Sequence, residues 1–177
     1  MTEVRTAHTA DLDGATRGAA RALLDAVFKG ELTDSDWEHA LGGVHALVWE
    51  GDELVGHASL VQRRLLYKRR ALRAGYVEGV GVSAVRRGRG HGAALMAALE
   101  RVVRGAYDLG ALGATDEAAR FYAARGWRRW KGPTSALTPE GILRTREEDG
   151  GIYVLPVALQ LDLSAALTCD WRDGDVW

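Results

Sequence analysis

Tyr76-Val-Glu-Gly-Val-Gly-Val-Ser-Ala-Val-Arg-Arg-Gly-Arg-Gly-His-Gly92 is the stretch that decides the fold. Alternating valines typical of a strand lead through a glycine-rich turn into a predicted helix. Glycine lets backbone N–H groups approach a ligand closely, because no Cβ intervenes. A helix start adds unpaired N–H donors and a partial positive charge. Arg86, Arg87 and Arg89 add full charges, so the stretch predicts an anion site, most naturally for a pyrophosphate.

Two other interpretations of this stretch are weaker. The pattern of a nucleotide-binding P-loop is absent. Gly79 to Ala84 formally match the dinucleotide fingerprint G-x-G-x-x-A, but Val80 and Val82 belong to the strand. The nearest acidic partner, Glu100, falls inside a predicted helix instead of ending a second strand. A glycine-rich loop with no ligand remains an alternative.

The flanking sequence alternates between strand and helix patterns. Strands are expected at Val4–Ala7, Val44–Trp49, Leu54–Leu66, Ala71–Val82, Tyr107–Leu112, Trp127–Trp130 and Ile152–Leu155, the last clear strand. Helices are expected from Asp13 to Phe28, from Thr33 to Leu41, over Ala93–Val103 and over Asp116–Arg125. Residues 131–150 are expected to be rich in turns. The three central strands predict an antiparallel meander, and the basic cluster on it (Arg63, Arg64, Lys68, Arg69, Arg70 and Arg73) reads as the solvated edge of a hairpin.

Length and composition exclude several classes. A chain of 177 residues without repeats or a linker predicts one domain, residues 1–177. Lys and Arg number 23 and Asp and Glu 24, so we expect no nucleic-acid partner. No apolar run is long enough to span a membrane, and Cys169 has no second cysteine to pair with. We therefore expect no signal peptide and a cytoplasmic location. The five histidines and Cys169 lack metal-ligand spacing, so no metal is expected.

Arg87-Gly-Arg-Gly-His-Gly92 has the form R-x-x-G-x-G and resembles the acyl-CoA motif of the GNAT superfamily of N-acetyltransferases. Phe121-Tyr-Ala-Ala-Arg-Gly-Trp127 resembles the second signature of that superfamily. The resemblance implies an α/β (α+β) fold. It would be a single acyltransferase domain whose mixed, mostly antiparallel sheet is splayed at the acyl-CoA site and flanked by helices. It implies acetyl-CoA as co-substrate, held by Val80, Gly81, Val82, Arg87, Gly88, Arg89, Gly90, His91, Gly92 and Glu117.

Further stretches resemble the aminoglycoside 2′-N-acetyltransferases of mycobacteria and relatives. They include Thr33-Asp-Ser-Asp-Trp-Glu-His39, Gly75-Tyr-Val-Glu-Gly-Val80 and the ending Cys169-Asp-Trp-Arg-Asp-Gly-Asp-Val-Trp177. The resemblance implies a homodimer that acetylates an amino group of aminoglycosides. It maps substrate contacts onto Glu31, Asp36, Glu78, Gly79, Gly113, Glu148, Asp175 and Trp177. A small hydroxyl residue stands in the family where this chain has Gly113, which leaves only a backbone contact there.

The charge pattern points independently to a cationic substrate. Acidic residues gather at Glu31/Asp34/Asp36/Glu38, at Glu147/Glu148/Asp149 and at Asp170/Asp173/Asp175 with the terminal carboxylate. Three such patches in a near-neutral protein suggest an anionic cleft, although each alone reads as solvated surface, and Asp36 alone as the partner of a capping box. We expect Trp171, Val176 and Trp177 to anchor the tail, and removal of residues 175–177 to spare stability.

Acetyl transfer requires a neutral amine. The resemblance makes Glu78 the base, acting through water, because a carboxylate of ordinary pKa is a weak direct base at neutral pH. It makes Tyr122 the acid toward the departing thiolate, and a backbone N–H near Val82 would polarise the thioester carbonyl. Two alternatives remain: a GNAT enzyme for another amine, such as a polyamine or a peptide N-terminus, and a non-catalytic acyl-CoA-binding module.

Overall fold

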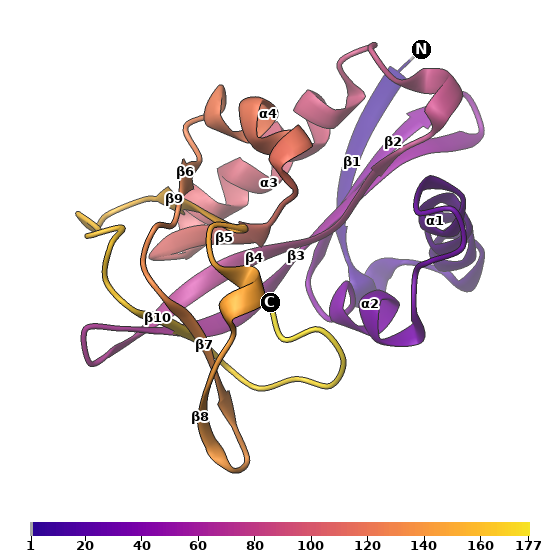
Figure 1. Cartoon of the computed structure of the whole chain (residues 1–177). Helices are drawn as coiled ribbons and strands as arrows, with labels where there is room; N and C mark the ends of the chain where they lie inside the picture. The colour runs from indigo at the N-terminus through magenta and orange to yellow at the C-terminus, as the bar shows by residue number, and fades with distance from the viewer. Residues whose placement is uncertain (1) are drawn as a thin grey trace. The chain divides into compact units, whose positions relative to one another are not determined.

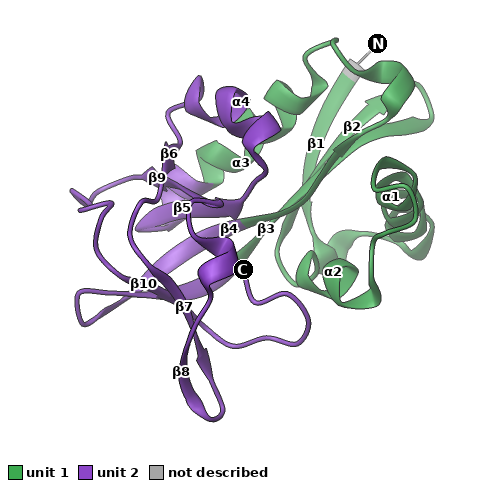
Figure 2. Cartoon of the chain, in the orientation of Figure 1, with its two compact units in different colours: residues 1–61, 77–102 green, residues 62–76, 103–177 purple. Residues whose placement is uncertain are grey.

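The computed structural model describes residues 2–177, which divide into two compact units (Figure 2). Unit 1 comprises the chain up to Val61 together with Val77–Val102, and unit 2 comprises Gln62–Tyr76 and Val103–Trp177. Three elements continue from one unit into the other: β3 (Glu53–Tyr67), β4 (Arg70–Val82) and α3 (His91–Ala106). None of the helices within residues 2–177 is long and apolar enough to span a bilayer.

Unit 1 is a sheet with helices connected to its strands (Figure 1). β1 pairs antiparallel with β2, from Thr2↔Glu50 to His8↔Val44, and β2 pairs antiparallel with β3, with a bulge at Val48/Trp49. Besides the shared elements it contains β1 (Thr2–His8), η1 (Thr9–Asp11), α1 (Gly14–Val27), α2 (Asp34–His39), β2 (Val44–Glu50) and η2 (Ala84–Arg86).

The two N-terminal helices begin where the sequence predicts. The Asp13 carboxylate accepts a hydrogen bond from the Thr16 N–H and caps α1. Thr33 and Asp36 form a reciprocal capping box at the start of α2. Leu24 of α1 is fully buried against β4, where a Cβ built on Gly81 would lie 2.9 Å from the Leu24 side chain. Glycine at position 81 therefore lets α1 approach the strand.

Unit 2 is a mixed sheet with strand order β6-β9-β5-β4-β3-β10-β7-β8. The β4–β5 and β10–β7 pairs are parallel, and the β4–β5 ladder covers only Ala74–Tyr76 of β4. The elements of this unit are β5 (Leu109–Gly113), η3 (Asp116–Ala118), α4 (Ala119–Ala123), β6 (Arg128–Arg129), β7 (Thr134–Thr138), β8 (Gly141–Arg144), η4 (Arg146–Glu148), β9 (Ile152–Pro156) and β10 (Leu167–Cys169). The predicted mixed α/β architecture is confirmed.

Several predicted elements differ in the structure. The helix expected over Asp116–Arg125 is a 3-10 turn followed by the five-residue α4, which Gly126 ends with a φ of 90°. Residues 131–150 are not only turns, because they contain the hairpin of β7 and β8. Ile152–Leu155 is not the last strand, because β10 follows it and pairs with β3 and β7.

The interpretation of the basic cluster as a solvated hairpin edge is wrong for Arg63. Its side chain is 4% exposed, forms an ion pair with Asp170 and lies over the Tyr76 ring. Lys68 and Arg69 do form the exposed hairpin turn, with φ values of 42° and 66°. Arg63 therefore belongs to the interior of unit 2.

Candidate active site

The glycine-arginine loop (Ser83–Gly92) connects β4 to α3 within unit 1. Gly88 and Gly90 have φ values of 76° and 85°, with open space where a Cβ would stand. α3 begins immediately afterwards, and Ala94 donates the first helical hydrogen bond to the Gly90 carbonyl. The preceding N–H groups of the first turn have no helical acceptor. The exposed Arg87 and Arg89 flank this turn, so the loop combines the donors and charges that a phosphate group needs.

Glu50, at the end of β2, organises the loop and is not apparent from the sequence. Its carboxylate accepts a hydrogen bond from His91 Nε2 at 2.8 Å and lies 3.3 Å from Arg86 Nε. Arg86 also pairs with Glu53 at 3.0 Å, and Arg89 lies 3.7 Å from Glu50. The Arg86 and His91 side chains thus fix the loop, and Arg87 Nε donates to the Val82 carbonyl at 3.4 Å.

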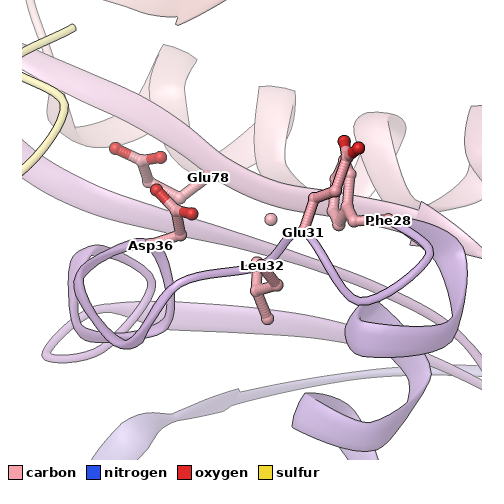
Figure 3. A pocket seen from close by; sticks show the side chains of 6 residues that line it. Phe28, Glu31, Leu32, Asp36 and Glu78 are labelled. Atoms are coloured by element: carbon pink, nitrogen blue, oxygen red, sulfur yellow. The ribbon is translucent and has the colours of Figure 1, made fainter.

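An acidic pocket of about 320 Å³ lies in unit 1 and is lined by Phe28, Glu31, Leu32, Asp36, Glu78 and Gly79 (Figure 3). Glu31 comes from the segment after α1, Asp36 from α2 and Glu78 from β4. One oxygen of Asp36 accepts the Thr33 N–H of the capping box at 2.8 Å, and the same carboxylate lines the pocket. Four residues that the resemblance assigned to substrate therefore lie together, and Phe28 and Leu32 were missed.

Gly79 has a φ of 54° and interrupts the regular strand beside Glu78. A Cβ at this position would lie 3.1 Å from Leu24. Its carbonyl accepts a hydrogen bond from His57 Nδ1 at 2.8 Å. A hydrogen bond from β3 therefore holds the backbone beside Glu78, and α1 leaves little room for a side chain at position 79.

Tyr122 lies on α4 in unit 2 and is 7% exposed. Its ring packs against Trp127, Phe121 and Tyr153, with centroid distances of 6.1, 5.1 and 6.2 Å. Burial raises the pKa of its hydroxyl to about 12. The Trp127 N–H donates to the Tyr122 carbonyl, which explains the motif physically: Gly126 turns the chain so that Trp127 packs on Tyr122. Glu117 lies exposed on η3, and Gly113 ends β5.

The C-terminal tail is fixed within unit 2. The Trp177 ring is 5% exposed, and its Nε1–H donates to Thr145 Oγ1 at 2.9 Å. Arg172 Nη2 donates to the Trp177 carboxyl end at 2.8 Å, and Arg63 Nη2 donates to the Val176 carbonyl at 2.7 Å. Trp171 is 48% exposed, so the expectation that it anchors the tail is wrong.

The predicted acidic patches separate into two roles. Asp34 pairs with Arg21, Asp149 with Arg144 and Asp170 with Arg63, so these acids already have partners within the chain, and only Asp170 pairs with a buried arginine. Glu148 behaves differently: burial and then the neighbouring charges of Asp175 and Glu147 raise its pKa. Like charges held close together are typical of a cation site. Within residues 2–177 no three His, Cys, Asp or Glu side chains are grouped as metal ligands.

The mixed sheet and the glycine-arginine loop are the features that the sequence resemblance to an N-acetyltransferase implied. A family profile described as "Acetyltransferase (GNAT) domain" matches residues 3–130, and the chain belongs to this family of acetyltransferases. The expected superfamily is confirmed. A curated relative, the aminoglycoside 2′-N-acetyltransferase of Mycolicibacterium fortuitum, is 54% identical over 98% of this chain and 91% of its own.

Solved structures agree on the fold. ElaA of Escherichia coli has a TM-score of 0.62 at 24% identity, over 88% of this chain and 99% of its own. An acyl-CoA N-acyltransferase of Pseudomonas aeruginosa has a TM-score of 0.64 at 18% identity, with the same coverage.

Proposed function

We propose that this acetyltransferase transfers the acetyl group of acetyl-CoA directly to the 2′-amine of aminoglycosides. The observation that carries the proposal is the acidic pocket, which places carboxylates from α2, from β4 and from the segment after α1 around one cavity. Aminoglycosides are polycations, and carboxylates recognise ammonium groups by charge-assisted hydrogen bonds. The relative of 54% identity, itself an aminoglycoside 2′-N-acetyltransferase, supports the same substrate class. Glu148, Asp175, Gly113 and the Trp177 carboxylate are proposed as further substrate contacts.

The glycine-arginine loop is proposed to bind the pyrophosphate of acetyl-CoA. Its donors are Arg87, Arg89 and the backbone N–H groups of Gly88, Gly90, His91 and Gly92. The His91 side chain is engaged by Glu50, so His91 contributes its N–H and not its ring. Val80, Gly81 and Val82 offer the strand edge for the pantetheine arm, and Glu117 a contact from η3.

In the proposed reaction the substrate amine attacks the thioester carbonyl, the C–S bond breaks and CoA leaves as its thiol. Through water, Glu78 takes a proton from the bound ammonium, so that the neutral amine can attack. Tyr122 donates its hydroxyl proton to the departing sulfur, and the proton that the nitrogen loses on forming the amide restores the Tyr122 hydroxyl. With a pKa of about 12, the Tyr122 hydroxyl keeps its proton throughout the neutral range and so has one to donate. A backbone N–H near Val82 polarises the carbonyl.

A thiol-release assay tests the substrate. The enzyme is given acetyl-CoA with an aminoglycoside carrying a 2′-amine, with a matched one carrying a 2′-hydroxyl, and with polyamines and peptides. CoA release with the 2′-amine alone, and a product acetylated at that nitrogen by NMR, is the expected result. Equal turnover of the 2′-hydroxyl compound or of polyamines would favour a GNAT enzyme for another amine. No turnover with any amine would favour the non-catalytic acyl-CoA-binding module.

We further propose that the chain is a single domain and forms a cytoplasmic homodimer. β8 ends the sheet of unit 2, and Leu137, Ile142 and Leu143 on the β7–β8 hairpin are 43%, 66% and 60% exposed. An exposed apolar edge strand favours association with another chain. Light scattering should give twice the mass of the 19.2 kDa chain, and Ile142→Asp should lower it to the monomer value.

A further inference from the structure

Two buried histidines of unit 1 form a hydrogen-bonded chain that ends at the acidic pocket. His45 lies on β2 and His57 on β3, and both side chains are fully buried. His45 Nδ1 lies 2.9 Å from His57 Nε2, and His57 Nδ1 lies 2.8 Å from the Gly79 carbonyl. At the other end His45 Nε2 lies 2.7 Å from Thr9 Oγ1.

The direction of this chain follows from what each atom can do. A carbonyl only accepts, so His57 Nδ1 carries the hydrogen. Burial lowers the pKa of both histidines to about 4, so each ring is neutral at pH 7 and carries one hydrogen. His57 Nε2 therefore accepts from His45 Nδ1, and His45 Nε2 accepts from the Thr9 hydroxyl. The Gly42 N–H in turn donates to Thr9 Oγ1 at 2.9 Å. Because His45 Nδ1 donates to His57 Nε2, His57 is held in the tautomer whose Nδ1–H donates to the Gly79 carbonyl.

His57 contacts a sequence neighbour of each of two pocket carboxylates, Glu78 and Asp36. On one side it holds the carbonyl of Gly79, the neighbour of Glu78. On the other side its ring lies 6.1 Å from the ring of Trp37, which follows Asp36 on α2. Ser59, also fully buried on β3, donates its hydroxyl to the Glu78 carbonyl at 3.4 Å.

Consecutive carbonyls of a regular strand point in opposite directions, yet those of Glu78 and Gly79 are both held by side chains of β3. The left-handed Gly79 makes this possible, since its φ is 54°. The side chains of His57 and Ser59 on β3 therefore stabilise the irregular backbone at Glu78 and Gly79, which differs from that of a regular strand.

We infer that His57, oriented by His45, is a positioning residue for acetyl transfer: it holds the Gly79 carbonyl and so sets the direction in which Glu78 enters the pocket. The inference rests on the proposed role of Glu78 as base. His57 contacts backbone and no reacting atom, so it acts only through its neighbour.

A matched pair of variants tests this. An asparagine side chain can place its amide nitrogen near the position of Nδ1, whereas that of glutamine reaches the position of Nε2. His57→Asn should therefore keep kcat/KM for the aminoglycoside within about threefold, while His57→Gln should lower it at least tenfold. Acetyl-CoA affinity, measured by calorimetry, should stay unchanged in both. Leu60→Ala, a buried β3 residue whose side chain faces the opposite way along the strand, controls for plain loss of stability and should leave kcat/KM unchanged.

A double-mutant cycle with Glu78→Gln separates this inference from the proposed function. If His57 acts through Glu78, adding His57→Gln to the Glu78→Gln variant should lower kcat/KM by less than a further threefold. Fully additive losses, or equal kcat/KM in the Asn and Gln variants, would overturn the inference. If Glu78→Gln alone is fully active, the base role fails instead, and with it the premise. Should the His57 variants not fold, His45→Gln removes the donor at Nδ1 that orients His57, whereas His45→Asn retains one, and equal kcat/KM in these two variants would overturn the proposal.

Discussion

Trp177 donates its indole N–H to the hydroxyl of Thr145, 32 residues earlier in the chain, at 2.9 Å. Both residues are buried, with 5% and 2% of their surface exposed. The last residue of the chain is thus part of the core of unit 2, while its carboxyl end is held by Arg172. This arrangement overturns the expectation that the tail could be removed without loss of stability.

Removal of Asp175 to Trp177 should therefore lower the melting temperature as well as substrate affinity. Loss of a buried tryptophan costs about 3 kcal/mol or more. In a chain of this size that corresponds to roughly 10 °C in Tm. Trp177→Phe removes the hydrogen bond, worth about 1 kcal/mol, together with part of the buried ring, and should cost less than the truncation. Calorimetry decides: an unchanged Tm in the truncated protein would contradict the packing described.

Arg87→Ser combined with Gly90→Ala should weaken acetyl-CoA binding well over tenfold. Charge-assisted hydrogen bonds to phosphate are worth about 1.5–3 kcal/mol each, and an alanine at a φ of 85° is strained. Calorimetric titration of the folded double variant measures the effect. If the double variant bound acetyl-CoA as tightly as the wild type does, the loop would not be the phosphate-binding site.

Tyr122→Phe should lower the rate of acetyl transfer by about 10²–10⁴-fold and leave both Kd values nearly unchanged. The aromatic packing on Trp127 is retained in the variant, so folding is not at risk. With a hydroxyl pKa of about 12, deprotonation of Tyr122 should add no break to the pH–rate profile below pH 10. Single-turnover kinetics isolate the chemical step, and a wild-type rate there would exclude Tyr122 from it.

Glu148→Gln should raise the stability of the protein and lower its affinity for the substrate. Because the folded-state pKa of Glu148 is raised, the folded protein binds more protons than the unfolded chain just above the ordinary pKa. Stability therefore falls as pH rises through that window, and at pH 7 the amide should melt higher than the carboxylate. KM for the aminoglycoside should rise about tenfold, the loss expected for one charged hydrogen bond. A lower Tm for Glu148→Gln than for the wild type at pH 7 would contradict the like-charge environment of Glu148.

Local chemistry made part of the structure predictable. The Asp13 cap, the capping box of Thr33 and Asp36 and the glycine-arginine loop depend on residues within a few positions of one another, and all three are confirmed. The hairpin of β7 and β8 was missed because Pro139 and Gly141, which mark its turn, also dominate the composition of the segment. β10 has three residues, and its partners lie about 33 and 100 positions away.

The candidate site was predictable where the resemblance supplied residues and not where side chains meet at long range. Glu31, Asp36, Glu78 and Gly79 do line one pocket. Glu50 and His91 are separated by 41 residues, and no local pattern links them. The buried Arg63 was assigned to solvent because a cluster of like charges normally is solvated, and its partner Asp170 lies 107 residues away.

Gly81 has a consequence for how this enzyme could be engineered toward other acyl donors. Its missing side chain gives room to Leu24 on the helix side of β4, where a Cβ would come within 2.9 Å. In a library randomised at position 81 alone, most variants would clash with Leu24 and fold poorly. Few of them could then be screened for activity with a new thioester. A smaller residue at position 24 would have to be installed first, so the order of mutational steps is set by the packing of α1.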